Sequence, residues 1–182
     1  MSKIHVISPG RNPGPFLLNC IDSVERQTLQ PNSHIIVDDM SDRETVNILK
    51  TCEKRNSYIE IIHNKTRNYR LKNIVDHASR QDPEDIICAV DSDDWLARKD
   101  ALSIIKKTYD DDPKLEYVYS NYRLSSNDEP DYSAVKHIED ILYVYHFYGN
   151  PNMPRVGPVA DERANLAVSS STYIKQRGYI EE

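Results

Sequence analysis

Short apolar runs alternate with longer amphipathic segments along the first two thirds of the chain. In the intervening segments apolar residues recur every three or four positions, which predicts helices over about 15–29, 42–52, 71–78 and 101–109. The apolar runs themselves predict strands at 4–8, 34–39, 58–63, 86–90 and 115–119. This alternation predicts an α/β domain with a mostly parallel, doubly wound sheet flanked by helices.

The regular pattern ends near residue 125, which leaves an irregular C-terminal region. Residues 138–148 are rich in Tyr and fit a helix or a strand equally well. Leu166–Val168 is expected to return to the sheet, and Ser169–Gln176 to form a short final helix that Gly178 would end. We expect a single domain over 1–182.

Charge and cysteine content exclude several classes of protein. The net charge of −6 argues against nucleic-acid binding, which needs a basic surface. Neither a signal peptide nor a membrane span is expected in this chain, because no apolar run is long enough. Cys20, Cys52 and Cys88 are widely spaced and are expected to be reduced and buried. Together these features lead us to expect a cytoplasmic protein.

Carboxylates follow two of the predicted strands. The fourth strand runs directly into Asp91-Ser92-Asp93, and the second ends in Asp38-Asp39. Charged groups do not stay inside a buried sheet without partners, so both sets are expected just past its carboxyl edge, where open α/β sheets bind ligands. One or two carboxylates with phosphate oxygens form a common site for a divalent cation. Taken alone, Asp-Ser-Asp also fits an acidic turn that caps the next helix.

Basic residues gather just after the third predicted strand, at the same edge. They are Lys65, Arg67, Arg70 and Lys72. The chain has only five glycines and lacks both G-x-G-x-x-G and the P-loop sequence, the usual backbone cradles for phosphate. A diphosphate bound here would therefore depend on a metal ion and basic side chains. The structural alternative is a solvated loop and helix start.

Four motifs occur in a defined order along residues 4–125. They are Pro9-x-x-Asn12, Ser23-Val-x-x-Gln27-Thr28, Ile36-Val-Asp-Asp-Met-Ser41 and Ala89-Val-Asp-Ser-Asp-Asp-Trp95. Together they resemble the family 2 glycosyltransferases of the GT-A fold. The resemblance implies an inverting transfer of a hexose from a UDP-sugar to a hydroxyl of a glycan or glycoconjugate, with Mn²⁺ or Mg²⁺. It also implies a nucleotide-sugar-binding half, 1–125, and an acceptor-side half, 126–182.

The resemblance assigns nucleobase contacts by position. Pro9, Gly10 and Arg11 would form the wall of the base pocket, Asp39 would hydrogen-bond the uracil, and Arg67 would contact the base. Arg11 stands where the family usually has an aromatic residue, so a guanidinium contact would replace ring stacking. Gly10 is also unusual at its position.

The remaining donor contacts come from the second acidic motif and the basic segment. Asp91 and Ser92 would face the ribose or the sugar, and Asp93 together with Asp91 would bind the metal and support catalysis. Lys72 belongs to the helix-opening element of the family and would contact the donor.

The catalytic base is the part of the resemblance that the chain does not supply clearly. Residues 165–182 resemble the family's stretch that precedes the base, so either the chain is a piece of a larger protein or the base lies elsewhere. Asp161 and Glu162 are the candidates within this chain.

Three other functions fit parts of the pattern. A phosphatase of the haloacid dehalogenase type also has D-x-D after a buried strand, but Trp95 stands where it expects Thr or Val. A nucleotidyltransferase would need a Gly-rich loop after the first strand. A non-catalytic GT-A-like domain that binds a nucleotide or glycan within a larger protein remains the main alternative.

Overall fold

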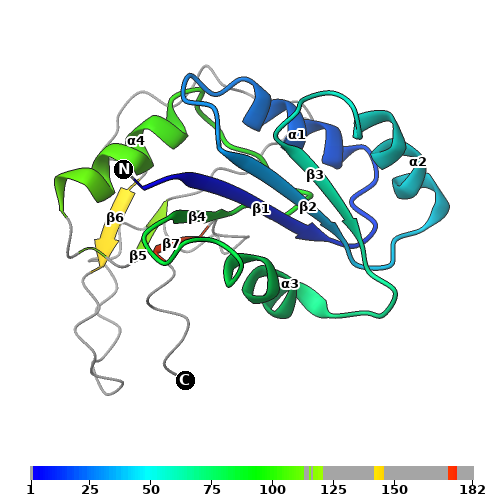
Figure 1. Ribbon diagram of the computed structural model, residues 1–182. Coiled ribbons are helices and arrows are strands. Elements are labelled where there is room, and N and C mark those ends of the chain that lie inside the picture. Colours follow the sequence, from blue (N-terminus) through cyan, green and yellow to red (C-terminus); the bar gives the residue numbers. More distant parts are fainter. Residues whose placement is uncertain (1, 113–114, 116, 121–141, 146–171, 176–182) are drawn as a thin grey trace, which may run out of the picture.

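The computed structural model describes residues 2–112, 115, 117–120, 142–145 and 172–175 (Figure 1). These residues contain a seven-stranded sheet in the order β3-β2-β1-β4-β7-β5-β6. Its strands are β1 (Ile4–Gly10), β2 (Ser33–Asp38), β3 (Ile59–His63), β4 (Ile86–Ala89), β5 (Tyr117–Ser120), β6 (Leu142–Tyr145) and β7 (Thr172–Lys175). The helices are α1 (Phe16–Glu25), α2 (Arg43–Cys52), α3 (Tyr69–Ala78) and α4 (Ala101–Asp111).

The first four strands form the parallel part of the sheet, as the alternating pattern predicted. Strand β1 lies at the centre of this part and pairs with β2 on one side and β4 on the other, while β3 pairs with the far side of β2. Each parallel connection runs through a helix, so the carboxyl ends of β1, β2 and β4 meet at one edge. That edge is where the predicted acidic motifs should converge.

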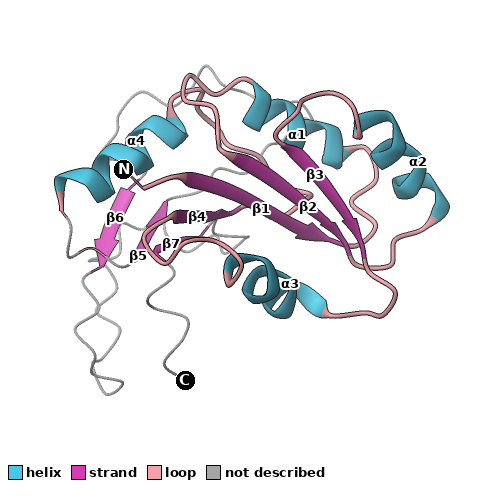
Figure 2. Ribbon diagram, viewed as in Figure 1, coloured by secondary structure: helices cyan, strands magenta, loops and turns pink. Residues whose placement is uncertain are grey.

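Helices cover both faces of the parallel strands (Figure 2). Helix α3 packs on one face, where Ile74 and Ala78 join Ile7, Ile35 and Ile87 in a buried cluster. Helices α1, α2 and α4 lie over the opposite face. Successive strand residues point to opposite faces, so Ile87 and Ala89 join this cluster, while Ile86 and Cys88 join a second cluster that includes Leu102 and Ile105 of α4.

Antiparallel strands complete the sheet beyond β4. Strand β7 pairs with β4 on one side and with β5 on the other, and β6 pairs with β5. The prediction of a helix over Ser169–Gln176 was therefore wrong. Thr172, Tyr173 and Ile174 favour strands, and pairing on both sides outweighs a weak helical pattern. The expected return of Leu166–Val168 to the sheet lies outside the described residues.

Two expectations from composition can be compared with the described part of the chain. Cys20, Cys52 and Cys88 are all buried and unpaired, as expected for small apolar side chains. Within the same residues, none of the helices combines the length and the apolar character that crossing a membrane requires.

Candidate functional site

The carboxyl ends of β1, β2 and β4 meet through backbone hydrogen bonds. The Asp39 amide donates to the Gly10 carbonyl at 2.9 Å, and the Ser92 amide donates to the Pro9 carbonyl at 3.2 Å. Both acidic motifs are thereby joined to the end of the same central strand. The structure thus brings Pro9, Gly10, Asp39 and the Asp91-Ser92-Asp93 turn together at one edge of the sheet.

Gly10 allows the closest of these approaches. A Cβ atom at this position would lie 1.6 Å from Ser92 Oγ and 2.8 Å from Ser92 Cβ, well inside contact distance. Ser92 is itself buried, with 2% of its surface exposed. The unusual glycine in the first motif is therefore explained by the turn that packs against it.

The loops after β1 and β2 are bonded to each other. The Asn12 amide donates to Ser41 Oγ at 2.9 Å, and the Asp42 amide donates to Asn12 Oδ1 at 2.7 Å. Arg11 Nε donates to the Met40 carbonyl at 3.1 Å, so its guanidinium lies beside the residue that follows Asp39. These contacts explain the spacing of residues within the two motifs, because each loop fixes the other.

Backbone strain is concentrated at the same edge. Among the described residues, the non-glycine residues with positive φ are Asn12 at 55°, Met40 at 65° and Tyr69 at 64°. Each lies in a loop that follows β1, β2 or β3 or at the start of α3, and left-handed backbone costs such residues of order 1–3 kcal/mol. Strain that the surrounding structure maintains in neighbouring loops favours a functional edge.

Asp39 is almost fully buried and receives several hydrogen bonds. Its Oδ1 accepts from Asn64 Nδ2 and from the Asn68 amide, and its Oδ2 accepts from the Tyr69 amide, each at 2.8 Å. The two amides belong to the start of α3, so the carboxylate caps that helix from another strand. Burial acts to raise the pKa of Asp39, but the hydrogen bonds from Asn68, Asn64 and Tyr69 outweigh it, and the pKa lies below its usual value.

Asp38 is held in a similar way. Its Oδ1 accepts from the Ser41 amide at 2.9 Å, and its Oδ2 lies 2.8 Å from His63 Nδ1. Both carboxylates at the end of β2 are thus used by the chain itself to fix the loops that follow β2 and β3.

Asp91 has a different environment. Its Oδ1 accepts from Arg70 Nε at 2.6 Å, and its side chain is 19% exposed. Burial raises the pKa of Asp91, the Arg70 guanidinium opposes this, the nearby Asp93 charge adds to it, and the pKa remains above its usual value. Asp93 is exposed. The Asp94 amide donates to the Asp91 carbonyl at 2.9 Å and closes the turn.

The chemistry of Asp91 and Asp93 fits a divalent cation. Both offer hard carboxylate oxygens from one turn, and the exposed Asp93 is accessible to an ion from solvent. Within the described residues no three His, Cys, Asp or Glu side chains converge on a metal position. The residues therefore fit Mg²⁺ or Mn²⁺ held by one or two carboxylates, whose remaining ligands would be phosphate oxygens and water.

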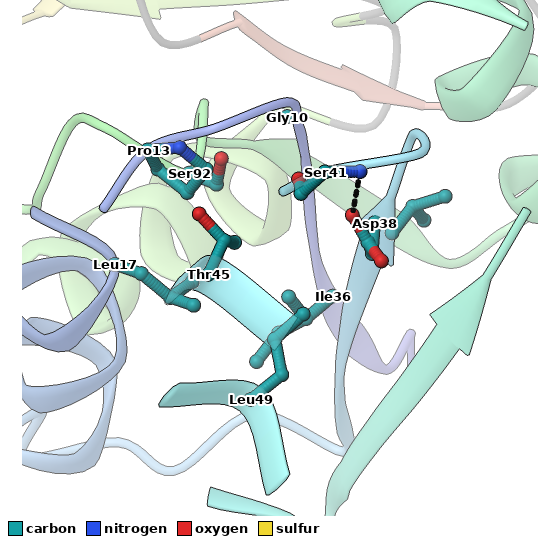
Figure 3. Close-up of a pocket in the computed structure, with 10 residues that line it drawn as sticks. Gly10, Pro13, Leu17, Ile36, Asp38, Ser41, Thr45, Leu49 and Ser92 are labelled. Carbon is teal, nitrogen blue, oxygen red and sulfur yellow. Dashed lines mark hydrogen bonds between the residues drawn. The ribbon is translucent and has the colours of Figure 1, made fainter. Parts of the chain in front are cut away.

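A small pocket lies beneath this edge, between α2 and the loops after β1 and β2 (Figure 3). Gly10, Ser92, Thr45 and Asp38 contribute to its walls. Its volume of about 10 Å³ has room for about one water molecule and is far below the roughly 300–1,000 Å³ of typical ligand sites. Ser92 Oγ is buried without a hydrogen-bond partner among the described residues. The pocket suits an ordered water, and a nucleotide would have to bind outside it.

The predicted basic residues separate into distinct environments. The Arg67 guanidinium lies over the Tyr69 ring, 4.4 Å from its centroid. Lys72 forms an ion pair with Asp76 at 2.6 Å, one turn further along α3. Arg70 forms an ion pair with Asp91 and so contacts the Asp91-Ser92-Asp93 turn.

Asn64 is a residue of the site that was not selected from the sequence. Asn64 directly follows β3 and bonds to both Asp39 and Asn73 at 2.8 Å. Applying the strand-end argument to β3 as well as to β2 and β4 would have identified it. Arg70 was recognised as part of the basic segment, but its partner could not be read from spacing. Asp161 and Glu162, the candidate bases, lie outside the described residues.

Comparison with protein families matches residues 5–165 to "Glycosyl transferase family 2". The chain belongs to this family. The match confirms the family that the four ordered motifs indicated. No protein of curated function matches the sequence.

Solved structures of other glycosyltransferases share the GT-A fold of this family 2 chain. A mannosyltransferase from Pyrobaculum calidifontis, solved with GDP-Man and Mn²⁺, has a TM-score of 0.58 and 19% identity over 66% of this chain and 36% of its own. S. aureus TarS has a TM-score of 0.54 and 20% identity over 63% of this chain and 20% of its own. A shorter form of TarS, solved with UDP-GlcNAc, gives 0.53 and 21% over 64% and 33%. The chain therefore spans between 20% and 36% of these proteins.

Proposed function

We propose that this chain transfers a hexose from a UDP-sugar to a hydroxyl of a glycan or glycoconjugate, with inversion at the anomeric carbon. The observation that carries the proposal is the Asp91-Ser92-Asp93 turn, in which Asp93 is exposed and which lies at the carboxyl end of a buried strand beside the end of β2. Relatives in fold bind UDP-GlcNAc in one case and GDP-Man with Mn²⁺ in another, which supports a nucleotide-sugar donor.

In this proposal different residues at the edge bind different parts of the donor, beginning with the base. Pro9, Gly10 and Arg11 form one wall of the base site, and Asp39 orients the loop that forms the opposite wall. Arg67 contacts the base from that loop. A uracil N–H would donate to the Asp39 carboxylate, which accepts a hydrogen bond from the Tyr69 amide at the start of α3.

The sugar and diphosphate would lie over the second acidic motif. Asp93 and Asp91 would hold Mn²⁺ or Mg²⁺, which when bound neutralises charge on the leaving nucleoside diphosphate. Asp91 and Ser92 would face the ribose or sugar, with Lys72 as a further donor contact. A carboxylate would accept the proton of the acceptor hydroxyl, and Asp161 and Glu162 are its candidates in this chain.

Thermal unfolding with a panel of nucleotides tests the donor assignment. UDP, GDP and several UDP-sugars are each added with Mn²⁺ or with EDTA, to the wild-type protein and to Asp93→Asn. A ligand at a hundred times its Kd adds about 2.7 kcal/mol to the free energy of unfolding, which raises Tm by several degrees. We expect a Mn²⁺-dependent shift with UDP-sugars that Asp93→Asn removes. An equal shift in the variant would contradict the role of Asp93, and no shift with any nucleotide would contradict the donor site.

The alternative is a non-catalytic domain that binds a nucleotide or glycan in a larger protein. It would give the same thermal shifts but no release of UDP with any acceptor. Measuring UDP release from each stabilising UDP-sugar, with a panel of glycan acceptors, separates the two functions.

A further inference from the structure

Arg70 contacts the second acidic motif through its Nε nitrogen. It is the second residue of α3, and its Nε donates to Asp91 Oδ1 at 2.6 Å. The Arg70 side chain is 46% exposed, whereas that of Asp91 is 19% exposed. The carboxylate therefore anchors the guanidinium at its inner nitrogen while the outer part of the group faces solvent.

The anchoring leaves the terminal nitrogens of Arg70 available. Within the part of the chain that the structure describes, the bond from Nε to Asp91 is the one hydrogen bond that this side chain makes. A guanidinium is planar and carries its donors in a rigid fork that matches phosphate oxygens, and its charge does not depend on pH. A carboxylate that fixes the Nε end reduces the freedom that the side chain would lose on binding an anion.

The negative charge of Asp91 and Asp93 would repel a diphosphate unless a positive group lay beside them. The turn carries both carboxylates, and the chain as a whole has a net charge of −6. A metal ion at Asp93 supplies positive charge on one side, and Arg70 lies on the Asp91 side.

We propose that Arg70 binds the diphosphate of the nucleotide donor, and that Asp91 positions its guanidinium for this role. The inference rests on the proposed function, because it assumes that the donor lies over the Asp91-Ser92-Asp93 turn. Arg70 then replaces part of the phosphate cradle that a Gly-rich loop provides in other nucleotide-binding proteins. Diphosphate recognition would in consequence persist in part when the metal is removed.

An affinity series isolates the phosphate contribution. Uridine, UMP and UDP are titrated calorimetrically into the full chain in EDTA and again in Mn²⁺, with guanosine, GMP and GDP as a parallel series. In wild type we expect UDP to bind more tightly than uridine even in EDTA, and the difference to shrink as NaCl is raised. In Arg70→Gln we expect UDP affinity in EDTA to fall about 10- to 100-fold, as for loss of a charged hydrogen bond, with uridine affinity changed less than about twofold.

Two further variants separate position from charge. Arg80→Gln removes the same charge beyond the far end of α3, where Arg80 contacts His77 instead of the acidic turn, and should leave the series unchanged. Arg70→Lys keeps the charge but loses the Nε anchor, so we expect it to recover less than half of the lost discrimination between UDP and uridine. Tm without ligand, measured for each variant, shows that the fold is retained.

The outcomes distinguish this inference from the proposed function. If Arg70→Gln binds UDP in EDTA as tightly as wild type, or loses uridine and UDP affinity equally, Arg70 has no role in phosphate binding, while the donor site stands. If wild type binds neither UDP nor GDP under any condition, the proposed function fails and the inference fails with it.

Discussion

The ends of β2 and β4 carry similar acidic sequences but different environments. Asp38 and Asp39 are buried, and each accepts hydrogen bonds from the loops around it. Asp91 is partly exposed with one guanidinium partner, and Asp93 is exposed. The pKa of Asp39 lies below its usual value because of its hydrogen bonds, whereas burial holds the pKa of Asp91 above its usual value.

The difference shows how one edge divides its tasks. The carboxylates of β2 are satisfied by the protein, so they stabilise the loops that form the site. At the end of β4, Asp91 pairs with Arg70 and Asp93 is exposed to solvent, so a cation or a donor can reach these carboxylates. The charge of Asp91 lowers the free energy of unfolding, and the hydrogen-bonded charge of Asp39 raises it. This matches the usual relation between a functional site and the structure that supports it.

The largest expected effect on stability comes from Asp39→Asn. An amide at this position offers an NH₂ group where backbone N–H groups need an acceptor, so the free energy of unfolding should fall by about 2–4 kcal/mol. Chemical denaturation at pH 7 measures this loss.

The pH dependence of that loss has a definite sign. A depressed pKa in the folded state means that the stabilisation is present above the unfolded pKa and is lost as the pH falls through the folded pKa. The difference between wild type and Asp39→Asn should therefore be constant near neutrality and shrink below about pH 4. A difference that stays constant down to pH 2 would contradict a role for the Asp39 charge.

Gly10→Ala should lower the free energy of unfolding by an intermediate amount. It should disturb both the loop after β1 and the Asp91-Ser92-Asp93 turn. The added Cβ would lie too close to both Ser92 Oγ and Ser92 Cβ, so the turn must move, at a cost of about 1–3 kcal/mol. The double variant Gly10→Ala/Ser92→Gly removes both clashing atoms and should recover most of the loss. Gly10→Ala/Ser92→Ala keeps the 2.8 Å Cβ contact and should recover less. Equal Tm values for the two double variants would contradict the packing argument.

The smallest expected effect on stability is that of Asp91→Asn. A raised carboxyl pKa means that the charged form destabilises the fold above the folded pKa, and that this penalty disappears as the pH falls below the unfolded pKa. Loss of the Arg70 ion pair offsets part of the gain, so stability at pH 7 should be unchanged or higher by less than about 1 kcal/mol. A loss as large as that of Asp39→Asn would erase the contrast between the two strand ends.

Much of this arrangement could be predicted from the chain itself. The apolar runs indicated the parallel strands because a strand buried on both faces is apolar throughout. Charged groups do not stay inside such a sheet, so both acidic motifs were expected past its carboxyl edge. The helix predicted over 42–52 is confirmed as α2, which Asp42 caps by accepting a hydrogen bond from the Thr45 amide at 2.9 Å. These features are local, so a short stretch of sequence determines each of them.

Features that depend on distant partners were harder to predict. Asp39 and Asp91 look alike in sequence, and what separates them is the presence of Asn68 and Tyr69 amides beside one and of Arg70 beside the other. The strand at 172–175 was predicted to be helical. Its pairing with β4 and β5 is non-local and could not be read from the local pattern. Such contacts are made by the tertiary fold, and intrinsic preference is too weak to reveal them.

The position of β7 has a consequence for how the protein is made. Ala89 pairs with Thr172, so β4 leaves the ribosome long before the strand that covers its open side. At roughly 5–20 residues per second, that side waits for several seconds as an unpaired, apolar edge. During vectorial synthesis the first four strands can assemble as a parallel unit, while β7 can join the sheet only after residues 172–175 have been made. During this interval the exposed edge is prone to aggregation, and binding by chaperones would protect it.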